Sequence, residues 1–324
     1  MPPERGGGHV CVIAVLQSLD ARHVAQIEGV DPRVQVVRVA NRATWYEEAP
    51  EAEVILGFRP LGGGVRRSRT LKWVHQSGAG VEHLSADVAG TDVVVTNTHV
   101  HGDTIAEHVF ALTLAHTRVL RQVVHYQSRR EWAHDLLHAR RLLAGATMGV
   151  LGLGTIGRAV ARRAVAFGMR VWGTRRHPST AVEGVERVLP PTGLDDVLRR
   201  SDVLVLTLPL TRETRGLVGA REFALLPRGA FLVNIGRGQL IDESALIDAL
   251  QSGHLGGAGL DVFAQEPLPE TSPLWNLPNV ILSPHVSGGF PGYMDHVVAL
   301  FCDNLRRYLT GQPLRNVVDT ALGY

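Results

Sequence analysis

The stretch Thr-Met-Gly-Val-Leu-Gly-Leu-Gly-Thr-Ile-Gly at residues 147–157 predicts the fold around it. Its first five residues are typical of a short buried strand, and an alanine- and valine-rich segment follows the last glycine, as in a helix. Glycines at this spacing suit a tight turn, close approach of the backbone to a pyrophosphate, and packing of helix on strand. The start of the helix offers N–H groups and a positive dipole end to phosphates. A glycine-rich turn also occurs without a ligand, but the strand before and the helix after favour a dinucleotide site at Gly152, Gly154, Thr155, Ile156 and Gly157.

The end of the next expected strand bears on the choice of cofactor. An acidic residue about 20 positions beyond the glycines would bind the ribose 2′-hydroxyl of NAD. The run Val-Trp-Gly-Thr-Arg-Arg-His at 171–177 contains no carboxylate. The guanidiniums of Arg175 and Arg176 suit a 2′-phosphate, which they can bind through forked hydrogen bonds. The alternative is that both arginines only solvate a loop in an arginine-rich chain. We therefore expect NADP(H) as the preferred cofactor, with NAD(H) possible.

Short β-branched runs alternate with amphipathic segments on both sides of this stretch, as in parallel α/β proteins. Apolar residues crowd the runs instead of alternating, as strands covered by helices on both faces require. The sequence predicts an α/β chain with two doubly wound parallel sheets, of which the larger is a Rossmann sheet. The expected strands are 10–16, 34–40, 54–58, 71–76 and 93–98 in the first sheet, and 147–152, 170–173, 203–208, 230–235, 259–262 and 280–283 in the second.

Between the two sheets, residues 104–119 carry apolar residues at three- and four-residue steps, which predicts a helix. The next stretch, 129–141, is heavily charged around Trp132. It either packs on its own sheet or projects toward a second subunit, and the sequence leaves both open. A further amphipathic helix is expected at 295–309, before the stop signal Thr-Gly-Gln-Pro at 310–313.

Composition excludes several classes of protein. Hydrophobic residues make up 45% and charged residues 20% of the 324 residues, as in an average globular protein. A formal net charge of +2 gives no reason to expect a nucleic acid or membrane partner. Two cysteines, Cys11 and Cys302, lack metal-ligand spacing, so we expect no metal site and a reducing compartment. Residues 1–8 lack the apolar core of a signal peptide, so we expect a frayed end and a cytoplasmic protein.

Three polar residues follow strands of the second expected sheet. Arg237 follows 230–235, Glu266 follows 259–262, and His285 follows 280–283. Ligands of open parallel sheets bind outside the carboxyl ends of the strands, where these residues would converge. Each of these residues alone gives little evidence of function. Most of the 15 histidines, for example, are expected to be surface or packed residues. Their joint placement predicts one catalytic site.

The chemistry of these three residue types suits reduction of a carbonyl. Hydride transfer to the carbon leaves negative charge on oxygen, which needs a proton and a nearby cation. Histidine titrates in the right range to supply the proton, and a neighbouring carboxylate raises its pKa and orients the ring. Arginine can bind a carboxylate and polarise the carbonyl beside it. We expect a small 2-keto or 2-hydroxy acid as substrate, with His285 as acid/base, Glu266 as its partner and Arg237 on the substrate.

These motifs resemble the D-isomer-specific 2-hydroxyacid dehydrogenases, and the resemblance runs through nearly the whole chain. It is carried by Val-Asn-Ile-Gly-Arg-Gly (233–238), Gly-Leu-Asp-Val-Phe-Ala-Gln-Glu-Pro (259–267) and Ser-Pro-His (283–285). The resemblance implies that Asp261 lies near the nicotinamide carboxamide and Thr104 near the nicotinamide. It also implies cofactor contacts at Thr207, Leu208, Pro209, Ile235, Gly236 and Gly288.

The resemblance further implies a substrate site in the first hundred residues. The loop Ser-Gly-Ala-Gly at 77–80 looks like the family's loop whose amides hold the substrate carboxylate, which gives Gly78, Ala79 and Gly80 that role. Arg59 stands where the family usually has a residue facing the substrate. A second arginine would suit an additional anionic or polar group there, or it is a surface residue. The sequence of the segment 286–293, after His285, differs from the one that is commonest in the family.

The family fold implies a discontinuous substrate-binding domain of flavodoxin-like form at 1–98 and 287–324, with the dinucleotide-binding domain at 99–286 inserted. It also implies a homodimer through the helical region at 100–140. Glu266 argues against a formate dehydrogenase, which has glutamine as the partner of the histidine. The absence of a C-terminal extension argues against a phosphoglycerate dehydrogenase with a regulatory domain.

Three functions remain open from the sequence. The first is an NADPH-preferring reductase of 2-keto acids, of the glyoxylate/hydroxypyruvate reductase type. The second is an NAD-linked dehydrogenase that works in the oxidative direction. The third is a dinucleotide-sensing interaction protein, like the corepressors that share this fold.

Overall fold

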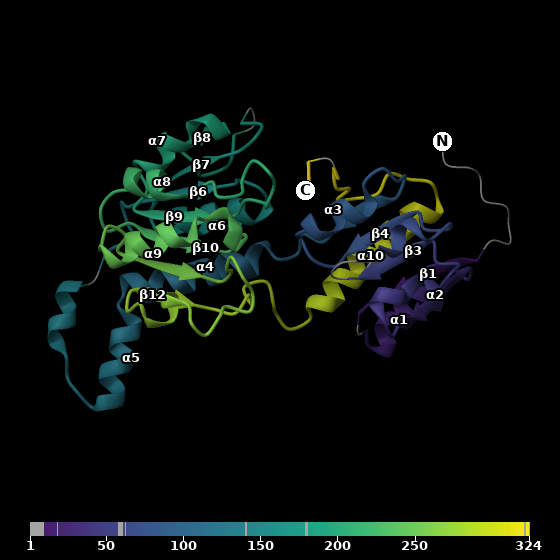
Figure 1. The fold of residues 1–324 in the computed structure, drawn as a ribbon, viewed down its shortest axis with the longest axis horizontal. Coiled ribbons are helices and arrows are strands. Elements are labelled where there is room, and N and C mark those ends of the chain that lie inside the picture. The colour runs from purple at the N-terminus through teal and green to yellow at the C-terminus, as the bar shows by residue number, and fades with distance from the viewer. Residues whose placement is uncertain are drawn as a thin grey trace. The chain divides into compact units, whose positions relative to one another are not determined.

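The computed structural model describes residues 10–323 except 18, 58–60, 62, 140, 179–180 and 321, and it leaves out the side chains of 85, 86, 137 and 139. Arg59 and the expected frayed end at 1–8 therefore lie outside the described residues. The chain forms two compact units (Figure 1). Unit 1 contains the described residues up to Val100 and from Phe290 onward, and unit 2 is His101–Gly289. The junctions lie close to those expected at 98 and 287.

Unit 1 is built on a parallel sheet of five strands in the order β2-β1-β3-β4-β5. The order is that of a flavodoxin-like doubly wound sheet, in which helices cover both faces. The expected strands are all present, and most are shorter than expected by a residue or two at one end. They are β1 (Cys11–Val15), β2 (Val34–Arg38), β3 (Val54–Gly57), β4 (Trp73–Gln76) and β5 (Val94–Asn97).

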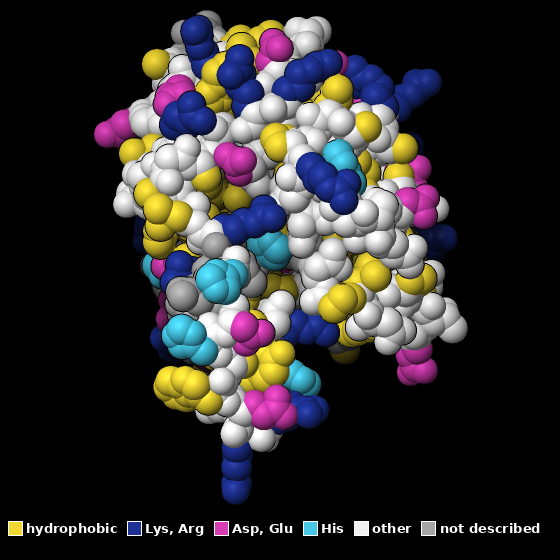
Figure 2. Space-filling view, turned by 90° about the vertical axis from the view of Figure 1, so that its left-hand side faces the viewer, with side chains coloured by type: hydrophobic (Ala, Val, Ile, Leu, Met, Phe, Trp, Pro, Cys, Tyr) yellow, Lys and Arg dark blue, Asp and Glu magenta, His cyan; other side chains and the backbone are white. Residues whose placement is uncertain are grey.

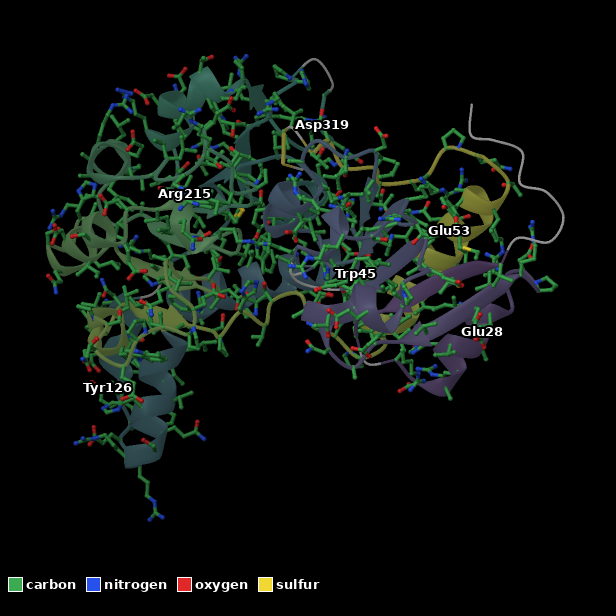
Figure 3. The ribbon with its side chains drawn as sticks, turned by 45° about the vertical axis from the view of Figure 1, so that its right-hand side comes forward. Glu28, Trp45, Glu53, Tyr126, Arg215 and Asp319 are labelled. Atoms are coloured by element: carbon green, nitrogen blue, oxygen red, sulfur yellow. The ribbon has the colours of Figure 1, made fainter. Side chains whose placement is uncertain are left out.

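Two hydrophobic clusters cover the faces of this sheet. On one face Trp73 stacks on Phe301 of the C-terminal helix with ring centroids 5.1 Å apart. On the other face the fully buried Trp45 packs between the sheet and the short helices beside it (Figure 3). The helices of the first face are α1 (Ala21–Glu28) and α10 (Tyr293–Leu309); those of the second are η1 (Arg42–Thr44), α2 (Trp45–Glu48), η2 (Gly64–Arg66) and α3 (Glu82–Val88).

Unit 2 contains a parallel sheet of seven strands in the order β12-β11-β10-β9-β6-β7-β8. Counted within the unit, this is the Rossmann order 3-2-1-4-5-6 with one strand added at the edge. The strands are β6 (Thr147–Leu151), β7 (Arg170–Thr174), β8 (Arg187–Leu189), β9 (Val203–Leu206), β10 (Phe231–Asn234), β11 (Gly257–Leu260) and β12 (Val280–Leu282).

The prediction of six strands was wrong by one, because it missed β8. This strand has only three residues, lies at the sheet edge and is not buried, so it lacks the apolar crowding that marks the others. The prediction for β11 was two residues late. The small residues Gly257 and Ala258 that open this strand carry little hydrophobic signal, although both are buried.

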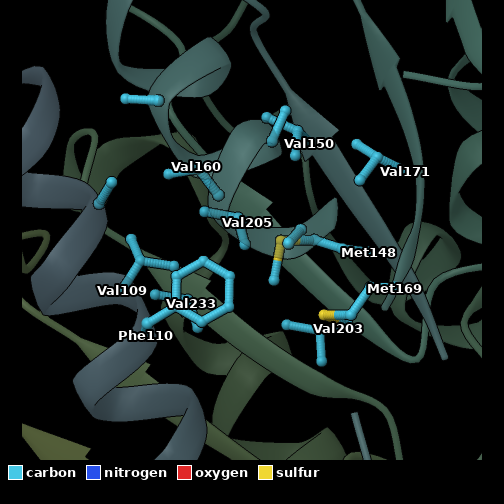
Figure 4. Packing of buried hydrophobic residues seen from close by; sticks show 14 of the residues in the cluster. Val109, Phe110, Met148, Val150, Val160, Met169, Val171, Val203, Val205 and Val233 are labelled. Atoms are coloured by element: carbon cyan, nitrogen blue, oxygen red, sulfur yellow. The ribbon is translucent and has the colours of Figure 1, made fainter. Parts of the chain in front are cut away.

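Helices cover both faces of the second sheet as well. In Figure 4, Val109 and Phe110 of α4 and Val160 of α6 pack against valines of the sheet, including Val150 and Val205. This burial explains why apolar residues crowd the strands instead of alternating. The helices are α4 (Gly102–Thr117) and α6 (Thr155–Ala166) on this face, and α7 (Leu194–Leu198), α8 (Ala220–Leu225) and α9 (Glu243–Gln251) on the other.

The charged region after α4 forms α5 (Leu120–Arg129) and a short 3-10 helix, η3 (His134–Ala139). No residue of α5 is buried within the described chain. Figure 3 shows this helix, with Tyr126 labelled, extending away from the sheet of unit 2. The structure thus shows that α5 buries no side chain against its own sheet, although Arg121 donates to the carbonyl of Val280 in β12 at 2.8 Å. Among the described residues, no helix has both the length and the apolar character needed to cross a membrane.

Candidate active site

The glycine turn lies at the point where the strand order of unit 2 reverses, between the neighbouring strands β6 and β9. The hydroxyl of Thr207, after β9, donates to the carbonyl oxygens of Leu151 at 3.0 Å and Gly152 at 2.6 Å. Gly152 has a φ of 104°, which favours glycine. A Cβ at Gly157 would lie 2.2 Å from the Gly152 carbonyl oxygen. The first and third glycines are therefore required by the turn itself.

The second glycine has a different environment. A Cβ at Gly154 would meet no heavy atom of the described chain within 4 Å. Helix α6 begins directly after it, and no side chain caps its start. The first amides of a helix need acceptors from outside the helix, and phosphate oxygens are suitable acceptors. The turn thus fits the pyrophosphate of a dinucleotide, with Thr155 and Ile156 in the first turn of α6.

The two arginines after β7 have unequal surroundings. The backbone N–H of Arg175 donates to the carbonyl of Leu189, in β8, at 2.9 Å, and its side chain is half-buried. The side chain of Arg176 donates through Nη2 to Oε2 of Glu213 at 3.0 Å. Glu213 lies in the loop after β9, beyond the half-buried Leu208 and Pro209. Sequence reasoning missed this carboxylate, because it is 37 residues from Arg176.

At the other side of the sheet edge, His285 and Glu266 meet. Nδ1 of His285 lies 2.7 Å from Oε2 of Glu266, and the second oxygen of Glu266 accepts the backbone N–H of Phe263 at 3.1 Å. A carboxylate accepts the proton on Nδ1, which leaves Nε2 for other partners. No described residue hydrogen-bonds to Nε2, and the imidazole is 49% exposed. This nitrogen is accessible to a ligand.

A buried carboxylate holds the loop that carries His285. Asp261 is fully buried, and its oxygens accept the hydroxyl of Ser283 at 2.6 Å and the amides of Val286 and Ser287 at 3.0 Å each. The amide of His285, which has a φ of 54°, donates to the Asp261 carbonyl at 2.9 Å. The carboxylate of Asp261, expected beside the nicotinamide carboxamide, is thus bonded to the His285 loop in this structure.

Ser283 and His108 extend this network, and the sequence analysis did not assign a role to either. Because the Asp261 carboxylate only accepts, the Ser283 hydroxyl donates to it. Its oxygen lies 2.9 Å from Nε2 of His108 on α4, so Nε2 carries a proton and donates. The available signal was the place of Ser283 in the motif Ser-Pro-His at 283–285, and that of His108 four residues beyond Thr104, which the resemblance places near the nicotinamide.

The loop that carries Arg237 lies against the loop that carries Glu266. A Cβ at Gly238 would lie 1.8 Å from the carbonyl carbon of Phe263, so only glycine permits this approach. The side chain of Gln239 donates to the carbonyl of Ala264 at 2.9 Å. The side chain of Asn234, at the end of β10, accepts a hydrogen bond from the Gly236 amide at 3.1 Å through Oδ1. It donates to the Arg237 carbonyl at 2.9 Å through Nδ2. The guanidinium of Arg237 is half-buried and also donates to the Gly236 carbonyl.

The remaining expected cofactor contacts lie on neighbouring elements of unit 2. Ile235 is buried directly after β10, and Thr104 is half-buried in the first turn of α4. His101, just before α4, donates through Nδ1 to the carbonyl of Gly288 at 3.2 Å. Burial lowers the pKa of His101, and the bond to Gly288 partly offsets this. The segment after His285 is therefore tied to the start of α4.

In unit 1, hydrogen bonds fix every carbonyl of the loop at 77–80. That of Ser77 accepts from the hydroxyl of Tyr293, that of Gly78 from the amide of Thr98, that of Ala79 from Asn97 Nδ2, and that of Gly80 from Gln76 Nε2. Within the described chain, the amides of Gly78, Ala79 and Gly80 have no acceptor. A loop whose carbonyls are bonded and whose amides are unused suits an anion. Burial raises the pKa of Tyr293 to about 12, so its hydroxyl stays a donor at neutral pH.

Comparison with known proteins agrees with this geometry. The family described as D-isomer specific 2-hydroxyacid dehydrogenase, NAD binding domain, matches residues 110–287, which lie within unit 2. A glyoxylate reductase of Korarchaeum cryptofilum is 35% identical over 297 residues, which cover 85% of this chain and 88% of that protein.

Two solved structures are similar over almost the whole chain. A D-isomer specific 2-hydroxyacid dehydrogenase from Xanthobacter autotrophicus Py2, in complex with NADPH and MES, has a TM-score of 0.85 and 34% identity, and the match covers 97% of this chain and 100% of that one. An NADPH-dependent glyoxylate/hydroxypyruvate reductase from Sinorhizobium meliloti, in complex with NADP and sulfate, has a TM-score of 0.84 and 31% identity, with the same coverage.

The Rossmann sheet, the glycine turn and these matches define an NAD(P)-dependent oxidoreductase. More particularly, the chain belongs to the D-isomer specific 2-hydroxyacid dehydrogenase family. The predicted fold class, family, enzyme class and use of a nicotinamide dinucleotide are confirmed.

Proposed function

We propose that this protein is an NADPH-preferring reductase of small 2-keto acids, with glyoxylate and hydroxypyruvate as the first substrates to test. The contact between His285 Nδ1 and Glu266 Oε2 at 2.7 Å carries the proposal, because it directs an accessible Nε2 outward. The names of the similar reductases from Korarchaeum cryptofilum and Sinorhizobium meliloti support the choice of substrates.

The proposed roles follow from the charge that develops during reduction. The bound nicotinamide supplies the hydride. His285 donates a proton from Nε2 to the carbonyl oxygen, and Glu266 stabilises the charged imidazole through Nδ1. Arg237 binds the substrate carboxylate and polarises the carbonyl. Asp261, through Ser283 and the amides after His285, holds the imidazole in place.

The dinucleotide would be held by unit 2, which we propose as the dinucleotide-binding domain. Gly152, Gly154, Thr155, Ile156 and Gly157 would bind the pyrophosphate, and Arg175 and Arg176 the 2′-phosphate of NADP(H). The segment of Thr207, Leu208 and Pro209 would lie beside the adenosine ribose. The nicotinamide would be approached by Thr104, Ile235, Gly236, Gly288 and, through its main chain, Asp261.

We propose unit 1 as the substrate-binding domain. The amides of Gly78, Ala79 and Gly80 would bind a carboxylate, because the four carbonyls of their loop are already hydrogen-bonded to the protein. Three amides that have no acceptor among the described residues, in one turn, can form an anion site without a charged side chain. The role of Arg59 in substrate binding stays a prediction, because Arg59 lies outside the described residues.

We also propose a homodimer that forms through α5 and the segment after it. Large apolar side chains are exposed here, and Figure 2 shows hydrophobic side chains among basic and histidine side chains on this protruding part of unit 2. Contiguous exposed apolar side chains mark interaction surfaces. They are Leu120 (46% exposed), Val123 (42%), Val124 (62%), Trp132 (93%) and Leu142 (74%). Light scattering on the wild type and on Val124→Asp tests this: a wild-type monomer would contradict it.

A cytoplasmic location remains part of the proposal. Cys11 and Cys302 are both buried free thiols, and burial raises the pKa of Cys302 to about 11, which disfavours its reactive thiolate. Cell fractionation with an antibody against the native protein tests the location. Recovery in an extracytoplasmic fraction would contradict it.

The proposed activity is tested by following nicotinamide absorbance with NADPH or NADH and a panel of 2-keto acids, and with NADP⁺ or NAD⁺ and the 2-hydroxy acids. We expect turnover of a keto acid with NADPH at a higher kcat/KM than with NADH. In His285→Ala, turnover should vanish while NADP⁺ still binds in calorimetry. Dinucleotide binding without turnover of any acid by the wild type would instead indicate a sensing protein.

A further inference from the structure

The ion pair between Arg176 and Glu213 lies between two segments that the proposed function assigns to the adenosine half of the cofactor. Arg176 follows β7, and Glu213 lies four residues beyond Pro209 in the loop after β9. We propose that Glu213 is a specificity-determining residue that sets the choice between NADPH and NADH. It competes with the 2′-phosphate for Arg176 and offers a carboxylate to the 2′-hydroxyl of NAD(H). This inference rests on the proposed dinucleotide site.

Hydrogen bonds fix the backbone on both sides of Glu213. The hydroxyl of Thr214 donates to the carbonyl of Pro209 at 2.7 Å and accepts the amide of Thr211 at 2.8 Å. The amide of Arg215 donates to the carbonyl of Thr211 at 3.1 Å. A closed turn therefore holds the backbone that carries Glu213, whose side chain is 77% exposed.

The pair makes the two arginines unequal. Among the described residues, no carboxylate pairs with Arg175, whereas Arg176 is engaged by Glu213 at 3.0 Å. A 2′-phosphate that binds both guanidiniums must displace the Glu213 carboxylate from Arg176. The phosphate then binds close to the negative charge of that carboxylate. Like charges at a binding surface lower affinity, so Glu213 weakens the binding of NADPH.

The same carboxylate favours the cofactor without the phosphate. NAD-binding Rossmann sites use an acidic residue to accept hydrogen bonds from the ribose hydroxyls. The strand end at 171–177 has no such residue, and Glu213 brings one to Arg176 from a different loop. One exposed carboxylate thus moves the two affinities in opposite directions.

Glu213→Gln removes the charge and keeps the shape of the side chain. We expect the Kd for NADP⁺ to fall about three- to tenfold and the Kd for NAD⁺ to rise about two- to fivefold, since surface charge effects are of this size. Isothermal titration calorimetry at low salt measures both values without turnover. The ratio of kcat/KM for NADPH and NADH should shift toward NADPH by the product of these factors.

Asp195→Asn is the matched control, because it also removes a carboxylate that an arginine contacts: Asp195 of α7 lies 2.6 Å from Arg221 of α8. It should leave both Kd values unchanged. If Glu213→Gln behaves like this control, or shifts toward NADH, the inference about Glu213 is wrong while the proposed function stands. If the wild type binds neither dinucleotide, the proposed function itself fails.

Discussion

The imidazole of His285 and the carboxylate of Glu266 meet at 2.7 Å between Nδ1 and Oε2, although 19 residues separate them in the chain. The two residues belong to loops after neighbouring strands, β11 and β12. The contact fixes which ring nitrogen holds a proton within the protein and leaves Nε2 for the substrate. Changes to this pair, and to the residues that hold it, should therefore affect chemistry more than binding.

Glu266→Gln should lower kcat about tenfold to a hundredfold, because an amide does not stabilise a charged imidazole. The Kd for NADP⁺ should change little, because Glu266 contacts the imidazole that acts in the chemical step. Initial rates and calorimetry measure the two effects. Glu270→Gln, an exposed acid in the same region, is the control. An unchanged kcat would show that Glu266 does not act on His285.

Ser283→Ala should lower kcat about fivefold to fiftyfold while the Kd for NADP⁺ changes little. The variant removes the hydroxyl that links Asp261 to His108, so the His285 loop loses one of its anchors. Ser283→Thr keeps the hydroxyl and should restore most of the activity. Equal losses of kcat in the alanine and threonine variants would argue against a role for the hydroxyl.

Tyr293→Phe should raise the KM for the keto acid several-fold with a smaller change in kcat. The variant removes the donor to the Ser77 carbonyl, so the loop of three unused amides is less well fixed. Tyr308→Phe is the control, because it removes another tyrosine hydrogen bond of unit 1. In this bond the Tyr308 hydroxyl donates to the Glu53 carboxylate at 3.0 Å. We expect the control to lower thermal stability without raising KM. A Tyr293→Phe enzyme with an unchanged KM would contradict the proposed carboxylate site.

The same substitution at two glycines should have different results. Gly154→Ala should fold normally and bind NADP⁺ about tenfold or more weakly, since its Cβ has no heavy atom of the described chain within 4 Å and would face the pyrophosphate. Gly157→Ala should lose stability, because its Cβ would lie 2.2 Å from the Gly152 carbonyl. Thermal melts with and without NADP⁺ separate the two. Unchanged NADP⁺ affinity in Gly154→Ala would contradict the proposed phosphate site.

Two buried histidines should make the protein acid-sensitive. Burial lowers the pKa of His75 to about 3 and that of His116 to about 4, with Arg141 adding to the shift at His116, against 6.5 in the unfolded chain. Both imidazoles therefore stay neutral in the folded state at pH values where they bind protons in the unfolded state. The stabilising effect is complete above pH 6.5 and is lost as pH falls toward the folded values, by up to about 1.4 kcal/mol per pH unit for each histidine.

The hydrogen bonds around His75 match the neutral imidazole that burial favours. Trp73 donates to the hydroxyl of Thr96, which then donates to Nδ1 of His75, and Nε2 donates to Thr98. A proton on Nδ1 would remove the hydrogen bond that the Thr96 hydroxyl donates to this nitrogen. Urea unfolding at pH 7.5 and 5.0 should show a smaller loss of stability in His75→Gln than in the wild type. His134→Gln, at an exposed site, should behave like the wild type; if His75→Gln does as well, the explanation is wrong.

Much of the architecture could be predicted because it depends on local patterns. Both doubly wound sheets follow from crowded β-branched runs, and the glycine turn follows from backbone sterics at Gly152 and Gly157. The edge strand β8 could not be predicted, since three partly exposed residues carry no apolar pattern. The placement of Arg237, Glu266 and His285 after strands was accessible, because parallel strands end at a common edge.

The sequence by itself therefore determined the two sheets, the glycine turn and the residue types at the strand ends. Only the tertiary structure decided how the polar side chains are bonded: Asp261 to the His285 loop, Tyr293 to Ser77, and Glu213 to Arg176. Periodicity and backbone conformation are set by near neighbours in the chain. A hydrogen bond between residues as far apart as Tyr293 and Ser77 depends instead on the path of the whole loop and on which groups have been removed from water.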